Sequence, residues 1–278
     1  MNSKTLPSSF CWAILFIFLW LSGCNNVATV FKECQDDGYC DLVLEVKQVK
    51  RLPRSPIWKT ENPVPQSIVG LGPQLITNPQ WPDPAVKNVT ISALRSKSEI
   101  IIRLEWEDDS NELDSSYSDD YTDKAALMFP LNPGTTIPPI TMGAEGEPVN
   151  IWQWKASLEK PLKKSLFPGS TPLSKTVTQD EKIETDIKKS PIEDLNAEGF
   201  STLTYQNNQN VFGKGIWKDK TWQVVFRRSL KTGDPRDTKF NGSTPMAIAI
   251  WNGANKERNG QKGGASGDGR PGGKKAAI

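Results

Sequence analysis

Short stretches of alternating apolar and polar residues, separated by turn segments, constrain the fold of this chain most. In residues 99–106, Ile102, Leu104 and Trp106 alternate with other side chains, which is the period of a β-strand with one face buried. The same pattern predicts further strands at 88–94, 125–129, 149–156, 200–205, 211–217, 222–228 and 246–251. No internal repeat and no long amphipathic helix accompany them. The chain is therefore expected to be mainly β, an antiparallel sandwich or barrel with minor helices and long loops.

The N-terminus has the pattern of a lipoprotein signal peptide. Lys4 precedes an unbroken apolar run at 11–21, which is too short to span a bilayer. The run ends in Leu-Ser-Gly-Cys, which resembles the cleavage box of bacterial lipoproteins. We therefore expect residues 1–23 to be removed, Cys24 to carry lipid, and the protein to be exported and anchored to a membrane, facing the periplasm. An ordinary signal peptide and a fortuitous apolar N-terminus are the alternatives.

Two cysteines, Cys34 and Cys40, remain in the expected mature chain after lipidation. Export to an oxidising compartment would allow a disulfide between them, and two free thiols are the alternative. The sequence has no Cys-x-x-Cys-His motif for covalent haem attachment and no zinc or iron–sulfur spacing.

Histidine is absent from the sequence. This excludes acid–base catalysis by His, His-containing triads, and every metal or haem site that needs an imidazole ligand. The 34 Lys and Arg residues nearly balance the 32 Asp and Glu residues. A nucleic-acid surface would need a strong basic excess, so no nucleic-acid partner is expected.

Composition divides the expected mature chain into one domain and less regular segments. Residues 158–193 are rich in Lys, Thr and Pro without apolar periodicity, which predicts a surface insertion. The chain beyond Lys262 is rich in Gly and lacks aromatic residues, so no closing strand is expected there. The expected units are an anchor and linker at 24–57, a β domain at 58–266 and a flexible tail at 267–278.

A series of short motifs runs in order through residues 55–266. They include GPQ at 72–74, RLEWED at 103–108, DKAA at 123–126, MG at 142–143, PVNIWQWKA at 148–156, LNAEGF at 195–200, AIWNG at 249–253 and KERNGQK at 256–262. Together they resemble the haem b (γ) subunits of the type II dimethyl sulfoxide reductase family. Its members include ethylbenzene and dimethyl sulfide dehydrogenases, chlorate and selenate reductases, and nitrite oxidoreductase.

The resemblance implies a β-sandwich that holds one non-covalent b haem between loops, with Met142 and Lys262 as the axial ligands of the iron. It implies an electron-transfer subunit without catalytic residues of its own. Its expected partners are an iron–sulfur β subunit, a molybdopterin α subunit and an external carrier such as cytochrome c.

The residues themselves fit this ligand set. Without His, haem iron must be held by Met, Cys, Lys or Tyr. Met1 lies in the signal peptide and Met128 and Met246 lie in predicted strands, so Met142 is the methionine in a Gly- and Pro-rich loop. One of Arg227 and Arg228, which end a predicted strand, could pair with a haem propionate, although surface charge is the default interpretation.

A lysine ligand meets a stricter requirement, because only the neutral amine binds a metal. Keeping a lysine of pKa near 10.4 neutral at pH 7 costs about 4–5 kcal/mol, which burial and iron coordination must supply. Lys256, Lys274 and Lys275 are rivals of Lys262. The Asn-Gly-Gln-Lys context selects Lys262.

A different class of protein is the alternative: a non-redox lipoprotein with a carbohydrate-binding type of β-sandwich, in which Trp side chains stack on sugars. The Met142-Gly motif and the Asn-Gly-Gln-Lys262 motif have no use in sugar binding. A visible spectrum separates the two hypotheses.

Overall fold

The structure is a computed structural model, and it describes part of the chain. The described residues are 31–34, 40–43, 46–53, 64–76, 78–114, 121–131, 139, 141–159, 190–265 and 276–277, with only the backbone described at 31–34, 40–43, 265 and 276–277. The predicted signal peptide, Cys24 and residues 160–189 of the predicted insertion lie outside this set.

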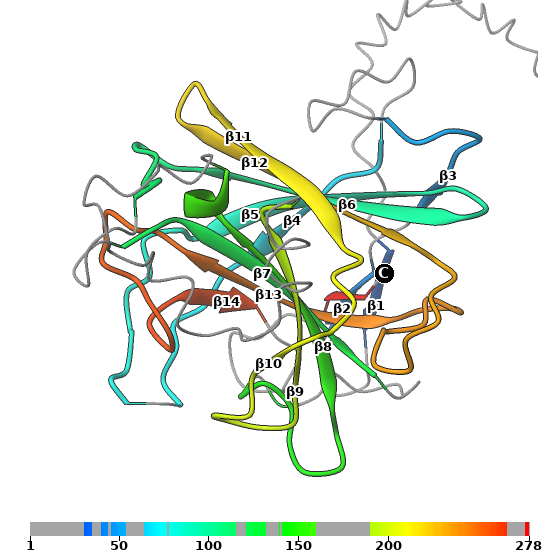
Figure 1. Cartoon of the computed structure of the whole chain (residues 1–278). Coiled ribbons are helices and arrows are strands. Elements are labelled where there is room, and N and C mark those ends of the chain that lie inside the picture. Colours follow the sequence, from blue (N-terminus) through cyan, green and yellow to red (C-terminus); the bar gives the residue numbers. More distant parts are fainter. Residues whose placement is uncertain are drawn as a thin grey trace, which may run out of the picture.

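The regular elements are almost all strands (Figure 1). They are β1 (Phe31–Cys34), β2 (Cys40–Val43), β3 (Lys47–Gln48), β4 (Ser67–Gly70), β5 (Asn88–Arg95), β6 (Glu99–Glu107), β7 (Lys124–Pro130), β8 (Val149–Lys155), the 3-10 helix η1 (Ala156–Leu158), β9 (Ile192–Ala197), β10 (Thr204–Tyr205), β11 (Phe212–Lys218), β12 (Thr221–Ser229), β13 (Pro245–Trp251), β14 (Gly263–Ala265) and β15 (Ala276–Ala277). Within the described residues no helix has the length and apolar character to cross a membrane.

Two sheets organise these strands. The first has six strands in the order β11-β12-β6-β5-β3, with β4 also paired to β5. The second has nine in the order β1-β2-β15-β13-β7-β8-β9-β10, with β14 also paired to β13. All pairings are antiparallel except those of β3 with β5 and of β15 with β2. The prediction of a mainly β, antiparallel sandwich is confirmed.

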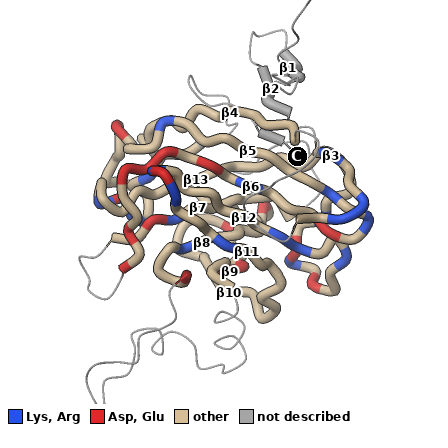
Figure 2. The backbone as a smooth tube through the Cα atoms, turned by 90° about the horizontal axis from the view of Figure 1, so that it is seen from above, with Lys and Arg blue, Asp and Glu red and all other residues tan. Residues whose placement is uncertain are grey.

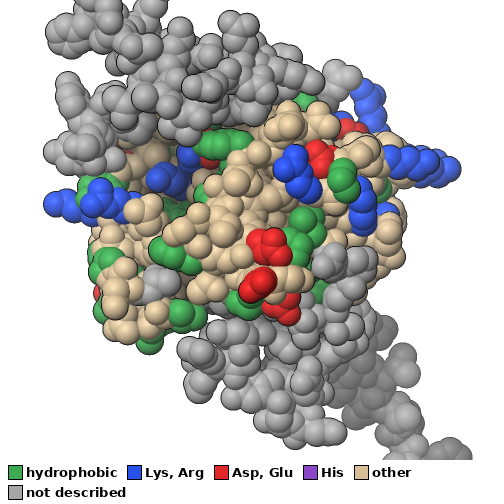
Figure 3. Space-filling view, turned by 60° about the horizontal axis from the view of Figure 1, so that its bottom comes forward, with side chains coloured by type: hydrophobic (Ala, Val, Ile, Leu, Met, Phe, Trp, Pro, Cys, Tyr) green, Lys and Arg blue, Asp and Glu red, His purple; other side chains and the backbone are tan. Residues whose placement is uncertain are grey.

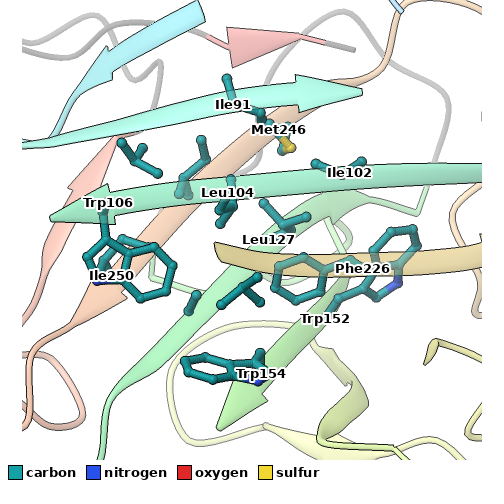
Figure 4. Close-up of a cluster of buried hydrophobic side chains, with 14 of the residues drawn as sticks. Ile91, Ile102, Leu104, Trp106, Leu127, Trp152, Trp154, Phe226, Met246 and Ile250 are labelled. Atoms are coloured by element: carbon teal, nitrogen blue, oxygen red, sulfur yellow. The ribbon is translucent and has the colours of Figure 1, made fainter. Parts of the chain in front are cut away.

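The inner faces of the two sheets meet in one large apolar core (Figure 4). Alternate residues of β6, including Leu104 and Trp106, point into it, as the period of two predicted. Trp152 and Trp154 of β8 face them from the second sheet. The ring centroids of Trp106, Trp154 and Trp222 lie between 4.7 and 6.4 Å from one another. Such aromatic pairs add about 0.5–1.5 kcal/mol each beyond the area they bury.

Arg228 closes one end of this core as a buried cation. It is 1% exposed, its guanidinium lies 4.7 Å from the ring centroid of Trp152, and it donates to Asn150 Oδ1 at 3.0 Å. Asp237 supplies the opposite charge at 3.6 Å. A buried charge persists only when it is paired and hydrogen-bonded. Arg228 is therefore part of the core. The sequence-based suggestion that it could pair with a haem propionate is wrong.

Several segments are more regular than the sequence indicated. Within the expected linker 24–57, β3 pairs with β5, and β1 pairs with β2. Within the expected tail 267–278, β15 joins β2 to β13. The strand β9 begins at Ile192, inside the range expected as a surface insertion, whereas only Thr204–Tyr205 of the stretch 200–205 forms a strand. Backbone pairing needs no apolar periodicity, so the sequence pattern did not reveal these short strands.

The strand β14 corrects the expectation that none follows Lys262. Gly263 and Gly264 pair with β13, and Gly264 also bridges to Gly72 beyond β4. A Cβ on Gly263 would lie 3.0 Å from the carbonyl oxygen of Val86, so a side chain would fit only tightly there. The absence of a side chain at Gly263 thus lets β14 pair with β13 while its backbone lies close to Val86 and Gly72.

Charged residues of both signs are interspersed along the described backbone (Figure 2). On the face shown in Figure 3, Lys and Arg lie towards its two sides, acidic side chains gather between them, and hydrophobic side chains form small separate groups. No described face in these views is uniformly basic.

The contact of β11 with the core gives a stability prediction. A Cβ on Gly215 would lie 2.3 Å from Cζ2 of the buried Trp154, so Gly215→Ala must displace a central side chain. We expect it to lower the free energy of unfolding by about 1–3 kcal/mol, measured by urea denaturation. Gly242→Ala is the matched control, since nothing lies within 4 Å of its Cβ position; its effect should stay within about 0.5 kcal/mol. Equal effects of the two substitutions would contradict this packing.

Candidate haem site

A cavity of about 510 Å³ lies on the outer face of the second sheet, away from the core. Protein pockets for small ligands and cofactors have volumes of roughly 300–1,000 Å³. Its walls come from loops that are far apart in the sequence: the β4–β5, β7–β8, β9–β10 and β13–β14 connections. The wall residues are Gln74, Ile76, Thr141, Met142, Phe200, Ser201, Leu203, Asn259, Gly260 and Lys262.

The floor of the cavity is built by the register of β13, β7, β8 and β9. Alternate residues of these strands point into the core, and the intervening residues point into the cavity. The floor therefore consists of three rows across the sheet: Trp251, Lys124 and Lys155; then Ala249, Ala126 and Gln153; then Ala247, Met128, Ile151 and Leu195. The small side chains of the middle row leave room for a flat ligand.

Met142 is held in the cavity wall by an unusual backbone. Its φ is 69° and that of Gly143 is 80°, and such values are uncommon for residues other than Gly. The carbonyl of Met142 accepts a hydrogen bond from the N–H of Gly199 at 2.9 Å, and the N–H of Gly143 donates to Pro139 at 2.9 Å. A Cβ on Gly143 would lie 2.4 Å from the carbonyl oxygen of Glu147. Strained backbone of this kind is found preferentially at functional sites.

Lys262 follows an irregular segment that is tied down by Glu257. Glu257 is fully buried. Its carboxylate accepts hydrogen bonds from Trp81 Nε1, the N–H of Ala85, the N–H of Asn252 and Asn255 Nδ2. The segment is thus fixed both to the end of β13 and to the distant 81–85 loop, and β14 begins immediately after Lys262.

The environment of Lys262 favours the form of the amine that binds metals. Its Nζ lies 5.1 Å from the ring centroid of Trp251. Burial lowers the pKa of Lys262 to about 8, because a charged amine loses hydration in the protein. At pH 7 the neutral form then lies only about 1.4 kcal/mol above the charged form, compared with the 4–5 kcal/mol of a solvated lysine.

The structure brings the two predicted ligands to one cavity, because both Met142 and Lys262 line it. Their separation in the sequence is 120 residues, so only the fold creates this arrangement. Among the rival lysines, Lys256 is exposed in a turn and is not part of the lining. Lys274 and Lys275 lie outside the described residues.

The two cysteines expected to remain after processing lie on paired strands. Cys34 and Cys40 are directly opposite each other in the β1–β2 pairing. Cα atoms of directly opposed residues in antiparallel strands are about 4.5–5.5 Å apart, which falls within the range of disulfides. The register is compatible with the predicted disulfide, which stays a prediction.

Sequence reasoning missed three residues of the floor. Met128 was set aside because it lies in an apolar strand, yet its face of β7 is the cavity face. Lys124 shares that face two rows away, and Lys155 is its neighbour on β8. The period of two in 124–128 and in 151–155 would have identified all three as opposite to the core. By contrast, Arg227 pairs with Glu99 at 2.6 Å and does not line the cavity.

Comparison with known proteins assigns the chain to a family. The family model described as ethylbenzene dehydrogenase matches residues 55–263. The chain belongs to the ethylbenzene dehydrogenase family. The matched range contains Met142 and Lys262, and it confirms the resemblance to the γ subunits of the type II dimethyl sulfoxide reductase family.

Three relatives extend this result. The chain is 27% identical over 212 residues to a putative respiratory nitrate reductase heme subunit of Haloferax mediterranei, covering 76% of this chain and 65% of the relative. It is 24% identical to the γ subunit of chlorate reductase of Ideonella dechloratans, covering 64% of this chain and 62% of the relative. It is also 24% identical to the γ subunit of dimethylsulfide dehydrogenase of Rhodovulum sulfidophilum, covering 63% of this chain and 57% of the relative. The chain thus spans less than two thirds of each relative.

Among solved structures, the chain is similar to a family 9 carbohydrate-binding module from Caldicellulosiruptor kristjanssonii, in complexes with glucose and with cellotriose. The TM-scores are 0.40 and 0.41, at 8% and 9% identity. The alignments cover 76% and 80% of this chain and 80% and 81% of those chains. Similarity at this level adds nothing to the assignment of a ligand.

The lowered pKa of Lys262 predicts a pH dependence of stability. Between pH 8 and 10.5 the unfolded apoprotein binds a proton at this lysine that the folded apoprotein does not. The free energy of unfolding should therefore rise with pH across this window, by about 3 kcal/mol from this group. Urea denaturation at several pH values should show that Lys262→Met removes this rise. Lys256→Met, an exposed lysine in the same segment, should leave it unchanged; parallel curves for the wild type and Lys262→Met would contradict the burial of this amine.

Proposed function

We propose that this protein is the haem b electron-transfer subunit of a molybdenum oxidoreductase complex. The observation that carries the proposal is that Met142 and Lys262, which are 120 residues apart in the sequence, line one cavity. In a chain without His, a thioether and a neutral amine are groups that would hold haem iron. Family membership and the heme subunit among the relatives support the same conclusion.

The cavity suits a porphyrin in its chemistry. Its floor is largely apolar, with Ala126, Ala247 and Ala249 leaving space for a flat ring and Met128 and Leu195 packing at its far end. Met142 and Lys262 would hold the iron. When bound, haem supplies a single-electron carrier that alternates between the ferric and ferrous states. The protein contributes ligand identity, exclusion of water and a fixed position.

The partners follow from the relatives. Two relatives are γ subunits of a reductase and of a dehydrogenase. We propose that this chain also belongs to a complex of several subunits, and that it works there beside an iron–sulfur β subunit and a molybdopterin α subunit. Electrons would pass one at a time between the iron–sulfur subunit and an external carrier such as cytochrome c. Catalysis on the substrate belongs to the α subunit, so this chain needs no catalytic residue.

We also propose that the protein is exported and anchored by lipid on Cys24 after removal of residues 1–23, facing the periplasm. The apolar run and the Leu-Ser-Gly-Cys sequence support this proposal. A disulfide between Cys34 and Cys40 would suit the oxidising environment there.

The sugar-binding alternative receives no comparable support. It requires Trp side chains displayed to solvent for stacking. In the part of the chain that the structure describes, every Trp is buried or half-buried, including those on β6, β8, β12 and β13. These rings build the core, and Trp251 lies in the floor of the cavity beside Lys262.

A visible spectrum tests the function. We expect the purified protein to show a Soret band and the pyridine haemochrome of haem b. Met142→Leu and Lys262→Ala should each lose haem or convert it to a high-spin spectrum, because one ligand of the iron is removed and the new side chain cannot replace it. The measurement is the absorption spectrum of oxidised and reduced protein at matched haem concentration.

Two variants serve as controls in this experiment. Met128→Leu keeps the shape of the cavity and removes the other thioether that lines it, and Lys256→Met removes a lysine from the same motif as Lys262. Both should retain the wild-type spectrum. If the absorption spectrum changes in Met128→Leu and does not change in Met142→Leu, the sulfur ligand is Met128 on β7. A colourless preparation from native membranes would refute the function itself.

A further inference from the structure

The floor of the cavity carries charged side chains at one end only. The row of Trp251, Lys124 and Lys155 carries two amines, whereas the row two residues away along the strands carries Met128, Ile151 and Leu195. The middle row has alanines and Gln153. A ligand that fills this space must therefore be apolar over most of its length and anionic at one edge.

The two amines lie side by side by the register of the sheet. Lys124 on β7 is directly opposite Lys155 on β8, and directly opposed side chains have Cβ atoms about 4.5–5.5 Å apart. Like charges in this position destabilise a sheet. Burial and the charge of Lys155 lower the pKa of Lys124, and the charge of Glu193 offsets this only in part. An anion beside Lys124 would offset the repulsion between these two amines.

Among the described residues, Glu193 is the carboxylate whose charge offsets the two amines, and its ion pair is with Lys155. Glu193 on β9 pairs with the Nζ of Lys155 at 2.6 Å and also accepts a hydrogen bond from the hydroxyl of Tyr205 at 3.0 Å. Within the described residues no carboxylate forms an ion pair with Lys124. Arg258, which is close enough to lower the pKa of Lys124 further, adds another positive charge. The polar end of the cavity thus has an excess of positive charge.

We propose that Lys124, with Lys155 beside it, is the binding site for the propionate carboxylates of the haem. This inference rests on the proposed function and adds the orientation of the ring in the cavity. The propionate edge lies over the row of Lys124 and Lys155, and the apolar edge of the ring lies over the row of Met128 and Leu195. The polarity of the floor then matches that of haem, which carries both carboxylates on one side.

The site also completes the charge balance of the sheet. A carboxylate against Lys124 would relieve its repulsion from Lys155, and hydrogen bonds between ionised groups are among the strongest in proteins. Arg228 cannot serve this purpose, because Asn150 and Asp237 occupy it in the core. Lys124 and Lys155 are thus the cations that line the cavity besides the proposed iron ligand.

The test compares ferric haem b with its dimethyl ester, in which both carboxylates are esterified and uncharged. Apoprotein of the full chain is titrated with each compound and the dissociation constants are measured. We expect Lys124→Met to weaken haem binding by about tenfold or more and to leave binding of the ester unchanged within about twofold. Lys155→Met should show the same selectivity with a smaller factor, since Glu193 already pairs with it.

A matched control is Lys214→Met, which removes the same charge from an exposed position on β11 of the first sheet. It should change neither constant. Binding of the ester to Lys124→Met shows that the cavity is still folded. An equal loss for both compounds would mean a merely structural role of Lys124, and no loss for haem would place the carboxylates elsewhere; either result overturns the proposal.

The outcomes separate this inference from the proposed function. If the wild type binds haem with the spectrum that depends on Met142 and Lys262 but Lys124→Met shows no selectivity, only the carboxylate site fails. If the wild type binds neither haem nor its ester, the function fails and the carboxylate site fails with it. In the expected case, the absorption spectrum of haem-saturated Lys124→Met stays that of the wild type, because Lys124 does not touch the iron.

Discussion

The structure depends on a sheet that is apolar on both faces. In β7 and β8, one set of alternate residues packs against the first sheet, and the other set includes Met128 and Ile151 in a second apolar cluster. A sheet of this kind must be covered on its outer side, because exposed apolar surface costs about 25 cal/mol per Å². The loops cover it only partly and leave the cavity. The position of the cavity that we propose for haem thus follows from the pattern of two adjacent strands.

The loops around the cavity are positioned by contacts over long sequence distances. The Met142 loop is tied to Gly199 through a backbone hydrogen bond, and the Lys262 segment is tied through Glu257 to the 81–85 loop. Each connection fixes one proposed ligand against a part of the chain that is remote in sequence. Side chains on rigidly held loops can bind a metal without first being ordered, which lowers the cost of binding.

Buried cationic side chains have different partners in the core and in the cavity. In the core, Arg228 has a carboxylate partner, and two of its three nitrogens donate hydrogen bonds within the protein. In the cavity, Lys124 and Lys262 have no such carboxylate among the described residues, and burial lowers the pKa of both. Groups perturbed by burial in a cavity are typical of functional sites. These amines, which lack a carboxylate partner among the described residues, therefore indicate a ligand-binding position in the cavity.

The sequence by itself determined the class of fold, because alternation in stretches such as 99–106 specifies strands with one face in a core. It also restricted the ligand chemistry, since the absence of His left Met, Cys, Lys and Tyr as haem ligands, and the family resemblance pointed to Met142 and Lys262. It did not predict β14 or β15, whose short strands form by backbone pairing. Only the tertiary structure decided that the two candidates share a cavity and that Lys124 lies at its polar end. Sequence periodicity describes the faces of single strands, whereas convergence depends on which strands and loops become neighbours.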